Sequence, residues 1–456
     1  MPATLLSRTT ARSGVGQPDA AEQERRRRIE ALKTELYKVL PPERIAALLA
    51  SDGDLAHKEV EEVVRRLAIA GSARVSAGAE RERLVAMVAS EVLGLGAIDA
   101  LIADASVTEV MVNGPYKIFF EREGKVCLSS ARYASEEQLR SVIDRIISPL
   151  GRRIDEQNPL VNGRLPEGHR VNAIIAPLSL DGSTLTIRKF NKRVFPLGEL
   201  VDAGSVDERV AQLLRWAVTA RRNIAVSGGT GSGKTTLLNA LSLEISPDER
   251  IITIEDSAEL KFQAHPHVVR LEARPANLEG KGQVTIRDLV INTLRMRPDR
   301  IVVGEVRGAE ALEMLQAMNT GHDGSLTTLH ANTPYEVITR LVTMVGYGAD
   351  LPLRHVEAQI AAALDVIVHL ERGADGKRRV TEVVELCSKA GECVQEDARP
   401  FVLRPIYTFE QTGTLADGSV VGQSRFLAEP DFVRTLAARA LADEDEVALW
   451  RQAASL

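Results

Sequence analysis

The sequence is short of cysteine and of aromatic residues. Its three cysteines, Cys127, Cys387 and Cys393, are an odd number at wide spacing. They offer neither a disulfide framework nor a zinc site, and they fit a reducing cytoplasm. Phe, Trp and Tyr make up only 4% of the 456 residues, which favours helices packed on a parallel sheet over an all-β sandwich. The expected fold class is therefore α/β.

Long apolar runs and an excess of positive charge are also missing. No stretch approaches the ~18 continuous apolar residues that would span a bilayer, and Met1 to Gln17 lack the apolar region of a signal peptide. The 57 Lys and Arg residues are outnumbered by 63 Asp and Glu residues, for a net charge of -6, which does not favour nucleic-acid binding along the chain. We therefore expect a soluble cytoplasmic protein, which can still dock at a membrane.

The pattern along the chain predicts a leader, a helical region and two domains. Residues 1–24, rich in Ser, Thr, Ala and Gly without periodicity, are expected to be disordered. Apolar residues at helical spacing predict a small bundle over 25–78. Hairpin signals such as Asn113-Gly114 predict an α+β N-terminal domain over 79–197. Short apolar strands alternating with helices then predict βαβ units with a parallel sheet, and a C-terminal extension, over 198–456.

A glycine-rich stretch, GGTGSGKTT, matches G-x-x-x-x-G-K-[ST] between an apolar strand and a helical pattern. Its glycines would let backbone N–H groups converge on phosphate oxygens, and the following helix adds the positive end of its dipole. Lys234 would reach the β- and γ-phosphates of ATP, and the Thr235 hydroxyl would ligate Mg²⁺. We expect a RecA-like P-loop NTPase domain with ATP and Mg²⁺ as cofactors. The expected nucleotide-binding residues are Gly228, Gly229, Thr230, Gly231, Ser232, Gly233, Lys234, Thr235 and Thr236.

Hydrolysis also needs carboxylates that hold the waters of magnesium and orient one of them for attack. Glu255 follows the apolar run 251–254, and Glu305 follows the run 301–304. Because the carboxyl ends of strands line the ligand crevice in a doubly wound sheet, both acids are expected beside the phosphate loop. Gly304 stands where the usual Walker B pattern has an Asp, which leaves Glu305 as the only acid there.

Two histidines lie in the Gly- and Thr-rich stretch NTGHDGSLTTLHAN. His322 and His330 are interpreted as sensors of the γ-phosphate, because an imidazole near that group would change its hydrogen bonding after hydrolysis. The alternative is that each histidine only makes structural hydrogen bonds, and the sequence leaves both open. Metal binding is not favoured, because no Cys or further ligand accompanies them at a zinc-site spacing.

Taken together, these motifs resemble the ATPases of type II and type IV secretion systems. The phosphate loop, the acidic box TIEDSAEL, the atypical Walker B stretch RMRPDRIVVGEVRG and the histidine box GHDGSLTTLHAN carry the resemblance. GLGAIDALIADASVTEVMVNGP, GRRIDEQNPLVNGRLPEGHRVNAIIAPLSLDGSTLTIRKF and LEARPANLEGKGQVTIRDLV look like the CpaF/TadA branch, which powers assembly of the Tad (type IVb) pilus. The likeness runs from about Leu32 to Leu386. The scattered cysteines also fit this branch, since type II secretion and type IVa assembly ATPases commonly carry a four-cysteine zinc element.

What the resemblance implies is a homohexamer of two-domain subunits, docked beneath an inner-membrane platform protein and peripheral to the membrane through its partners. ATP hydrolysis would drive domain rotations that extrude or retract pilin. Lys234 and Thr235 match the phosphate and Mg²⁺ ligands of the family, and Glu255 and Glu305 match its acidic pair. We favour Glu255 for polarising the attacking water and Glu305, through water, for the magnesium shell, with the exchange of these roles as the alternative.

The family also uses arginines from the domain before the phosphate loop to reach a nucleotide's phosphates. Arg170 and Arg188 lie in the matching segments. Arg295 and Arg297 are further candidates, for which a simple salt bridge is the alternative. A γ-phosphate that bridges two domains would close them, and its loss would release them.

Two functions of other classes stay open beside this motor. A nucleic-acid translocase shares the loop and sheet but predicts a basic channel with interleaved aromatics, and the acidic balance and few aromatics count against it, so no nucleic-acid partner is expected. A nucleotide-gated scaffold would bind ATP and oligomerise but scarcely hydrolyse it, as the missing Walker B Asp suggests. The rate of ATP hydrolysis distinguishes the hydrolysing motor from these alternatives.

Overall fold

The chain folds into two compact units, Met1–Asn191 and Lys192–Leu456. The computed structural model describes residues 20–41, 44–45, 48, 53–70, 78–122, 124–165, 167–190, 193–262, 265–276, 281–388, 400–415 and 418–455. Most of the expected leader, residues 1–19, and Cys393 therefore lie outside the described residues. Within the leader's predicted range, the helix α1 already begins at Ala20, because Ala, Glu, Gln and Arg are good helix formers.

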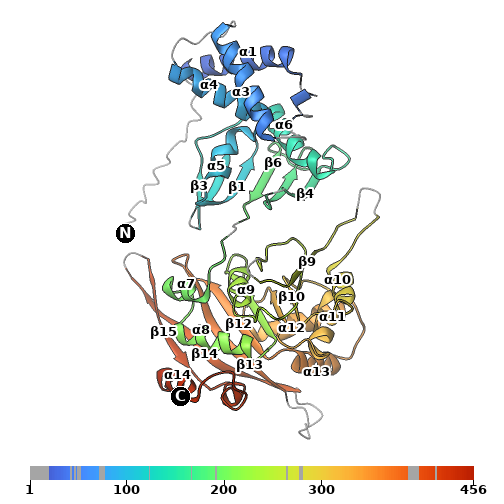
Figure 1. Cartoon of the computed structure of the whole chain (residues 1–456), viewed down its shortest axis with the longest axis vertical. Coiled ribbons are helices and arrows are strands. Elements are labelled where there is room, and N and C mark those ends of the chain that lie inside the picture. The colour runs from blue at the N-terminus through green and yellow to red at the C-terminus, as the bar shows by residue number, and fades with distance from the viewer. Residues whose placement is uncertain are drawn as a thin grey trace, which may run out of the picture. The chain divides into compact units, whose positions relative to one another are not determined.

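Three helices open the first unit: α1 (Ala20–Val39), α3 (Gly53–Ala70) and α4 (Gly78–Leu93) (Figure 1). Their apolar residues at helical spacing share one buried cluster, which includes Leu32, Val64 and Val88. The helical region therefore extends past residue 78 to include α4, which the sequence pattern placed in the following domain. No single described helix is long and apolar enough to cross a membrane, and only the bent pair of α4 with Gly96–Ala103 reaches that length and composition.

A six-stranded antiparallel sheet follows in the order β3-β2-β1-β6-β5-β4. Its strands are β1 (Val107–Asn113), β2 (Ile118–Arg122), β3 (Lys125–Leu128), β4 (Leu160–Arg164), β5 (Arg170–Ile174) and β6 (Thr184–Arg188). The short helix α5 (Asp99–Ala103) precedes β1, and α6 (Glu136–Ile147) buries its apolar residues in the same core as the sheet. The expected hairpin at Asn113-Gly114 is present, with Gly114 at a φ of 69°.

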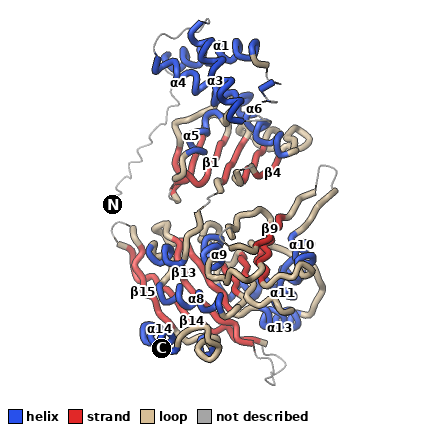
Figure 2. The backbone as a smooth tube through the Cα atoms, in the orientation of Figure 1, coloured by secondary structure: helices blue, strands red, loops and turns tan. Residues whose placement is uncertain are grey.

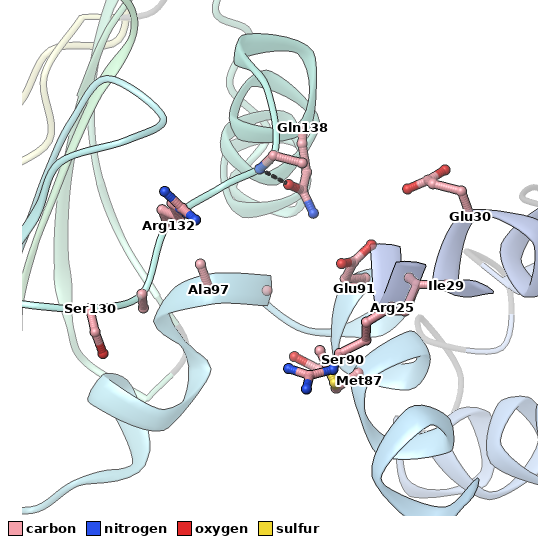
Figure 3. A pocket seen from close by; sticks show the side chains of 13 residues that line it. Arg25, Ile29, Glu30, Met87, Ser90, Glu91, Ala97, Ser130, Arg132 and Gln138 are labelled. Carbon is pink, nitrogen blue, oxygen red and sulfur yellow. Dashed lines mark hydrogen bonds between the residues drawn. The ribbon is translucent and has the colours of Figure 1, made fainter. Parts of the chain in front are cut away.

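Hydrogen bonds at the end of α4 tie it to α6 and to the connection that precedes α6. The Tyr133 hydroxyl donates to the carbonyl of Leu95 at 2.8 Å, and the Arg145 guanidinium donates to the carbonyls of Glu91 and Val92 at 2.7 and 2.6 Å. A pocket opens beside this junction, between α1 and α4 and the segments around Ala97 and Arg132 (Figure 3). Acidic and basic side chains both line it, among them Arg25, Glu30, Glu91 and Arg132.

The second unit is built on a nine-stranded sheet in the order β15-β14-β13-β12-β7-β11-β10-β8-β9 (Figures 1 and 2). The strands from β12 to β9 pair in parallel, and those from β12 to β15 pair antiparallel. The bounds are β7 (Ile224–Gly228), β8 (Ile251–Glu255), β9 (Val268–Glu272), β10 (Arg300–Val303), β11 (Leu326–Leu329), β12 (Val366–Arg372), β13 (Arg378–Ser388), β14 (Phe401–Thr414) and β15 (Val420–Phe426). The parallel sheet that the alternating pattern predicted is therefore present.

Helices cover both faces of this sheet. In β7, Ile224 and Val226 belong to one buried cluster with α8, α9 and α14, whereas Ala225 belongs to another with α11, α12 and α13. This division follows from the alternation of side chains along a strand. The helices are α7 (Leu197–Asp202), α8 (Glu208–Thr219), α9 (Lys234–Ser242), α10 (Ile286–Thr293), α11 (Glu310–Asn319), α12 (Pro334–Gly346), α13 (Leu353–Ala363) and α14 (Glu444–Ala454).

An aromatic cluster holds the helix α14 to the rest of the second unit, and it leads to a first prediction. Trp216 and Trp450, the only tryptophans of the chain, meet edge to face with ring centroids 5.7 Å apart, and the Trp450 indole donates to the carbonyl of Arg209 at 2.9 Å. Trp450→Ala should lower the free energy of unfolding of the second unit by about 3–5 kcal/mol. Urea unfolding followed by the fluorescence of Trp216 measures this change.

The neighbouring Leu449 provides the matched control, because it lies in the same helix and is 66% exposed. Leu449→Ala should change the free energy of unfolding by no more than about 0.5 kcal/mol. Equal urea midpoints for the Trp450 and Leu449 variants would show that α14 does not stabilise the unit.

Candidate functional site

The glycine-rich loop connects β7 to α9 at the carboxyl edge of the parallel strands. Gly228 and Gly233 have φ angles of 149° and 101°, which L-residues with a side chain rarely adopt. A Cβ at Gly228 would also lie 2.3 Å from the carbonyl oxygen of Leu370 in β12. The loop therefore needs glycine for its backbone conformation and for its close approach to the neighbouring strand.

Lys234 lies at the start of α9 and is folded back onto this loop. Its ammonium group is buried and donates to the carbonyls of Gly228 and Gly229, each at 2.9 Å. A third neighbour is Nδ1 of His330, at 3.5 Å. A cation is thus held at the amino terminus of a helix, where the helix dipole adds positive potential and anions bind favourably.

The other loop residues surround this cation. Gly229, Thr230 and Gly231 are exposed, Thr235 and Thr236 are half-buried in the first turn of α9, and Ser232 is buried. The loop is braced from β13 by Arg378, whose Nε donates to the carbonyl of Gly231 at 2.9 Å. Arg378 was missed in the sequence, because only the pairing of the strands brings it to the loop.

Glu255 ends β8 and is almost fully buried, with an exposed fraction of 3%. One carboxylate oxygen accepts backbone hydrogen bonds from Glu259 at 2.6 Å and Leu260 at 2.8 Å, which fold the following loop around it. Burial raises the pKa of Glu255 to about 7, and the two hydrogen bonds oppose this shift only in part. Its other oxygen, Oε1, has no hydrogen-bond partner among the described residues. This carboxyl group can exchange a proton near neutral pH, as a general base must.

The absent Walker B Asp has a steric explanation in this geometry. A Cβ at Gly304 would lie 2.8 Å from Cγ of Glu255 and 3.4 Å from its Oε2. An Asp side chain at position 304 would therefore collide with Glu255 and set a second carboxylate against it. Glycine at this position makes room for the acid of the neighbouring strand.

Glu305 and His330 follow β10 and β11 and meet at the same edge. Nε2 of His330 lies 2.7 Å from one carboxylate oxygen of Glu305, and the Arg307 guanidinium donates to the other at 2.5 Å. Burial, followed by the charge of Lys234, lowers the pKa of His330. With its proton on Nε2, a neutral ring would face Glu305 with that nitrogen and the ammonium group of Lys234 with Nδ1. Lys234, His330, Glu305 and Arg307 thus form one connected polar chain.

His322 is placed at the opposite edge of the sheet. It precedes β11 by four residues, and β11 runs parallel to β7, so it lies at the amino end of the strands whereas the phosphate loop lies at their carboxyl end. Its Nδ1 donates to the carbonyl of Ala317 in the last turn of α11, at 3.1 Å. The γ-phosphate role does not fit His322 within its own chain, and the structural alternative describes its contacts.

The candidate arginines divide between the two units. In the first unit, Arg170 and Arg188 are cross-strand partners on β5 and β6, and Arg164 on β4 pairs with Arg170, so three arginines stand in one row. In the second, Arg295 and Arg297 follow α10 and are exposed. Neither of these two forms an ion pair with a residue that the structure describes, and their role in phosphate binding stays a prediction.

Oxygen atoms suited to a hard cation are present at the loop. The hydroxyl of Thr235 and the carboxylate of Glu305 are ligand types that Mg²⁺ prefers. Two further buried oxygens, Oγ of Ser232 and Oε1 of Glu255, have no hydrogen-bond partner in the described part of the chain. The donor set therefore fits a magnesium nucleotide.

Comparisons with known proteins agree with these motifs. The family of type II/IV secretion system proteins matches residues 91–405. A putative conjugal transfer protein of Mycobacterium tuberculosis is 41% identical over 308 residues, 66% of this chain and 87% of its own length. The type IV secretion system protein VirB11 of Bartonella quintana is 32% identical, over 63% of this chain and 90% of its own. Among solved structures, the VirB11 ATPase of Brucella suis matches 63% of this chain and 95% of its own at 31% identity, with a TM-score of 0.36.

The close approach of Glu255 to Gly304 predicts how a methyl group added at position 304 affects stability. Gly304→Ala should lower the free energy of unfolding by about 1–3 kcal/mol, because the added Cβ displaces Glu255. The cost should largely disappear in a Glu255→Ala background, where the colliding Cγ is removed. Urea unfolding of the two single variants and the double variant measures the coupling.

Gly346→Ala is the matched control, since a Cβ there meets no atom within 4 Å. It should not destabilise the protein. A Gly304→Ala cost that is the same with and without the Glu255 side chain would disprove the steric explanation.

The raised pKa of Glu255 predicts a pH dependence of stability. The folded pKa is about 7 against 4.5 for the free group, so the folded state holds the proton more tightly. Its stabilising effect is complete below about pH 4.5 and is lost as pH rises to about 7. The wild type should therefore lose about 3 kcal/mol relative to Glu255→Gln across this window. Parallel curves of unfolding free energy against pH for the two proteins would contradict the shift.

Proposed function

Because the chain belongs to the family of type II/IV secretion system proteins, we propose that it is an ATP-hydrolysing motor of a secretion or pilus system. The observation that carries this proposal is the convergence of Lys234, Glu255, Glu305 and His330 at the carboxyl edge of one parallel sheet. A cation for phosphate, a carboxyl group with a pKa near 7 and a connected polar chain together suit hydrolysis of a nucleotide.

Lys234 would bind the β- and γ-phosphates, exchanging its two loop carbonyls for phosphate oxygens. The backbone N–H groups of the loop would hold the same phosphates. Thr235 through its hydroxyl, and Glu305 through water, are the residues that would hold Mg²⁺. When bound, that ion would neutralise part of the charge that develops on the phosphates.

Glu255 is the better candidate for the base, and its burial and raised pKa support this assignment over the exchange of roles. Its Oε1 has no partner among the described residues and would accept a proton from the attacking water. Glu305 instead has His330 within ion-pair distance of one oxygen and accepts a hydrogen bond from Arg307 at the other. A carboxylate held in this way suits a magnesium shell.

His330 would report the state of the nucleotide. Its ring joins Lys234 to Glu305, so a change in the phosphates that Lys234 contacts is transmitted to the polar chain. Loss of the γ-phosphate would shift Lys234 back to its loop carbonyls. His330 is thus the residue through which hydrolysis could begin a movement of the following segment.

We further propose that the subunits form a cytoplasmic homohexamer beneath an inner-membrane platform protein, in the CpaF/TadA branch that assembles Tad pili. The sequence motifs between about Leu32 and Leu386 support this branch. The relatives named for conjugal transfer and type IV secretion support transfer of a macromolecular substrate as the other task of the same motor. Arg170 and Arg188 lie in the segments that match the family's phosphate-contacting arginines, and this match supports the same role for them here.

The steric role of Gly304 supports a hydrolysing motor over a nucleotide-gated scaffold. The missing Asp suggested weak hydrolysis, but position 304 lies against Glu255, so the site keeps two acids on neighbouring strands. The absent Asp is therefore no argument for lost catalysis.

The test is ATP hydrolysis by the purified chain at concentrations that span monomer to oligomer, as followed by light scattering. Glu255→Gln should lower kcat by about 10²–10⁴-fold while ATP still binds, because a general base is lost. Lys234→Ala should lose binding of a fluorescent ATP analogue. Glu410→Gln, which removes an exposed carboxylate on β14, should leave both properties unchanged.

Three results would redirect the proposal. Nucleotide binding and oligomers without turnover, with wild type and Glu305→Gln alike, would favour the scaffold. Hydrolysis stimulated by DNA or RNA would favour the translocase. A rate that Glu255→Gln leaves intact would remove this residue from the role of base.

A further inference from the structure

A histidine is buried in the strand next to the phosphate loop and takes no part in the proposed chemistry. His369 lies in the apolar strand β12, with an exposed fraction of 1%. β12 pairs in parallel with β7, and the register places His369 opposite Ser227, which is fully buried. A polar ring in such a position is costly unless its nitrogens are hydrogen-bonded.

Both nitrogens of this ring have partners. Nδ1 lies 2.9 Å from Oγ of Ser227, and the ring makes a backbone hydrogen bond with Asn332. The charged groups that face it are Glu371, at 3.6 Å from Nε2, together with Glu336 and Lys234. Burial is the main cause that lowers the pKa of His369, so the ring is neutral. With Nε2–H donated to the Asn332 carbonyl, Nδ1 accepts from the Ser227 hydroxyl.

These two hydrogen bonds join three segments of the site. Ser227 is the residue before Gly228, where the phosphate loop begins. Asn332 follows His330 by two residues, and its N–H donates to the carboxylate of Glu336 in the first turn of α12, at 3.0 Å. The ring therefore connects the strand that enters the loop, its own strand β12, and the connection from β11 to α12 that carries His330.

We propose that His369 is a positioning residue that holds the His330 segment at a set distance from the phosphate loop. With the ring in place, Nδ1 of His330 stays within reach of Lys234 while Nε2 stays on Glu305. Without it, the β11–α12 connection loses its hydrogen bond to β12 and keeps only the contacts of His330 and the cap contact of Asn332 among those described above, so the polar chain can separate more easily. The kinetic consequence rests on the proposed ATPase function, whereas the spacing itself does not.

Asn223 offers a matched comparison at the other edge of the same three strands. It precedes β7, its side-chain oxygen accepts from the N–H groups of Gly324 and Ser325 at 2.9 Å, and its amide donates to Ala363 at 2.7 Å. Like His369 it is buried and joins the β7, β11 and β12 segments, but it lies away from the phosphate loop. Loss of Asn223 therefore reports the cost of breaking such a bridge without touching the site.

Two substitutions separate the two hydrogen bonds of the ring. An amide oxygen in His369→Asn can replace Nδ1 as acceptor for Ser227, but the bond to Asn332 is lost. An amide nitrogen in His369→Gln can replace Nε2 as donor to Asn332, but the bond to Ser227 is lost. Ser227→Ala removes the hydrogen bond between Ser227 and Nδ1 of His369, while the histidine ring stays in place.

The first readout is hydrogen exchange, which does not require activity. In the full-length protein, His369→Asn should speed exchange of the amides in residues 330–336 about tenfold or more, because the segment opens more often. His369→Gln should leave these amides near the wild-type rate. Asn223→Ala should speed exchange at residues 324–325 and leave residues 330–336 unchanged.

The second readout is the separation of kcat from nucleotide binding. His369→Asn should lower kcat about tenfold or more through misplacement of His330, while the affinity for a fluorescent ATP analogue changes little. Asn223→Ala should lower thermal stability with kcat per folded protein unchanged. Ser227→Ala should speed exchange in residues 227–234 and leave residues 330–336 near the wild-type rate. Faster exchange at 330–336 in this variant would contradict the assignment of that segment's hydrogen bond to the other ring nitrogen, even if the His369 variants do not fold.

The outcomes distinguish this proposal from the function on which it rests. Unchanged exchange at 330–336 in His369→Asn, or kcat losses that follow thermal stability equally in the His369 and Asn223 variants, would overturn the positioning role. A wild type without ATP turnover would instead overturn the proposed function. In that case the exchange experiment would still decide whether His369 holds the segment.

Discussion

The parallel pairing of the strands β12, β7, β11, β10 and β8 is the constraint on which the site depends. Parallel ladders bring every strand's carboxyl end to the same edge, so residues more than 100 positions apart in the chain become neighbours. Gly228 and Glu255 end β7 and β8, Glu305 and His330 follow β10 and β11, and Leu370 in β12 lies opposite Gly228 in the last pair of its register with β7. Helices on both faces bury the strands and fix this alignment.

Contact between neighbouring strands then sets the chemistry at that edge. Burial of Glu255 over Gly304 raises its pKa to about 7 and leaves one oxygen without a partner among the described residues. Burial, followed by the charge of Lys234, lowers the pKa of His330, whose neutral ring lies between the lysine and Glu305. The same short distances that give each group its protonation state also couple it to its neighbour, so the site is one connected unit.

Local sequence patterns predicted the helices and strands well. What they missed are contacts between residues that lie far apart in the sequence. The phosphate loop and the two acids were found because each is a short motif next to an apolar strand. The predicted bundle ends at residue 78, whereas the buried cluster of α1 and α3 also includes residues of α4. His322 resembled His330 in its setting, yet the two lie at opposite ends of β11, a distinction that depends on strand direction.

The sequence by itself determined the α/β fold class and the candidate residues of the phosphate loop and of the acidic pair. These features follow from periodicity and spacing within some ten residues. Over so short a stretch, the covalent chain alone sets the distance between the residues of a motif. Tertiary structure alone decided which histidine lies between Lys234 and Glu305 and why position 304 is glycine. It also brings His369 to Ser227 and Arg378 to Gly231, where each makes a hydrogen bond. Such contacts depend on which strands become neighbours and in what register, and burial of apolar surface over the whole sheet selects that arrangement.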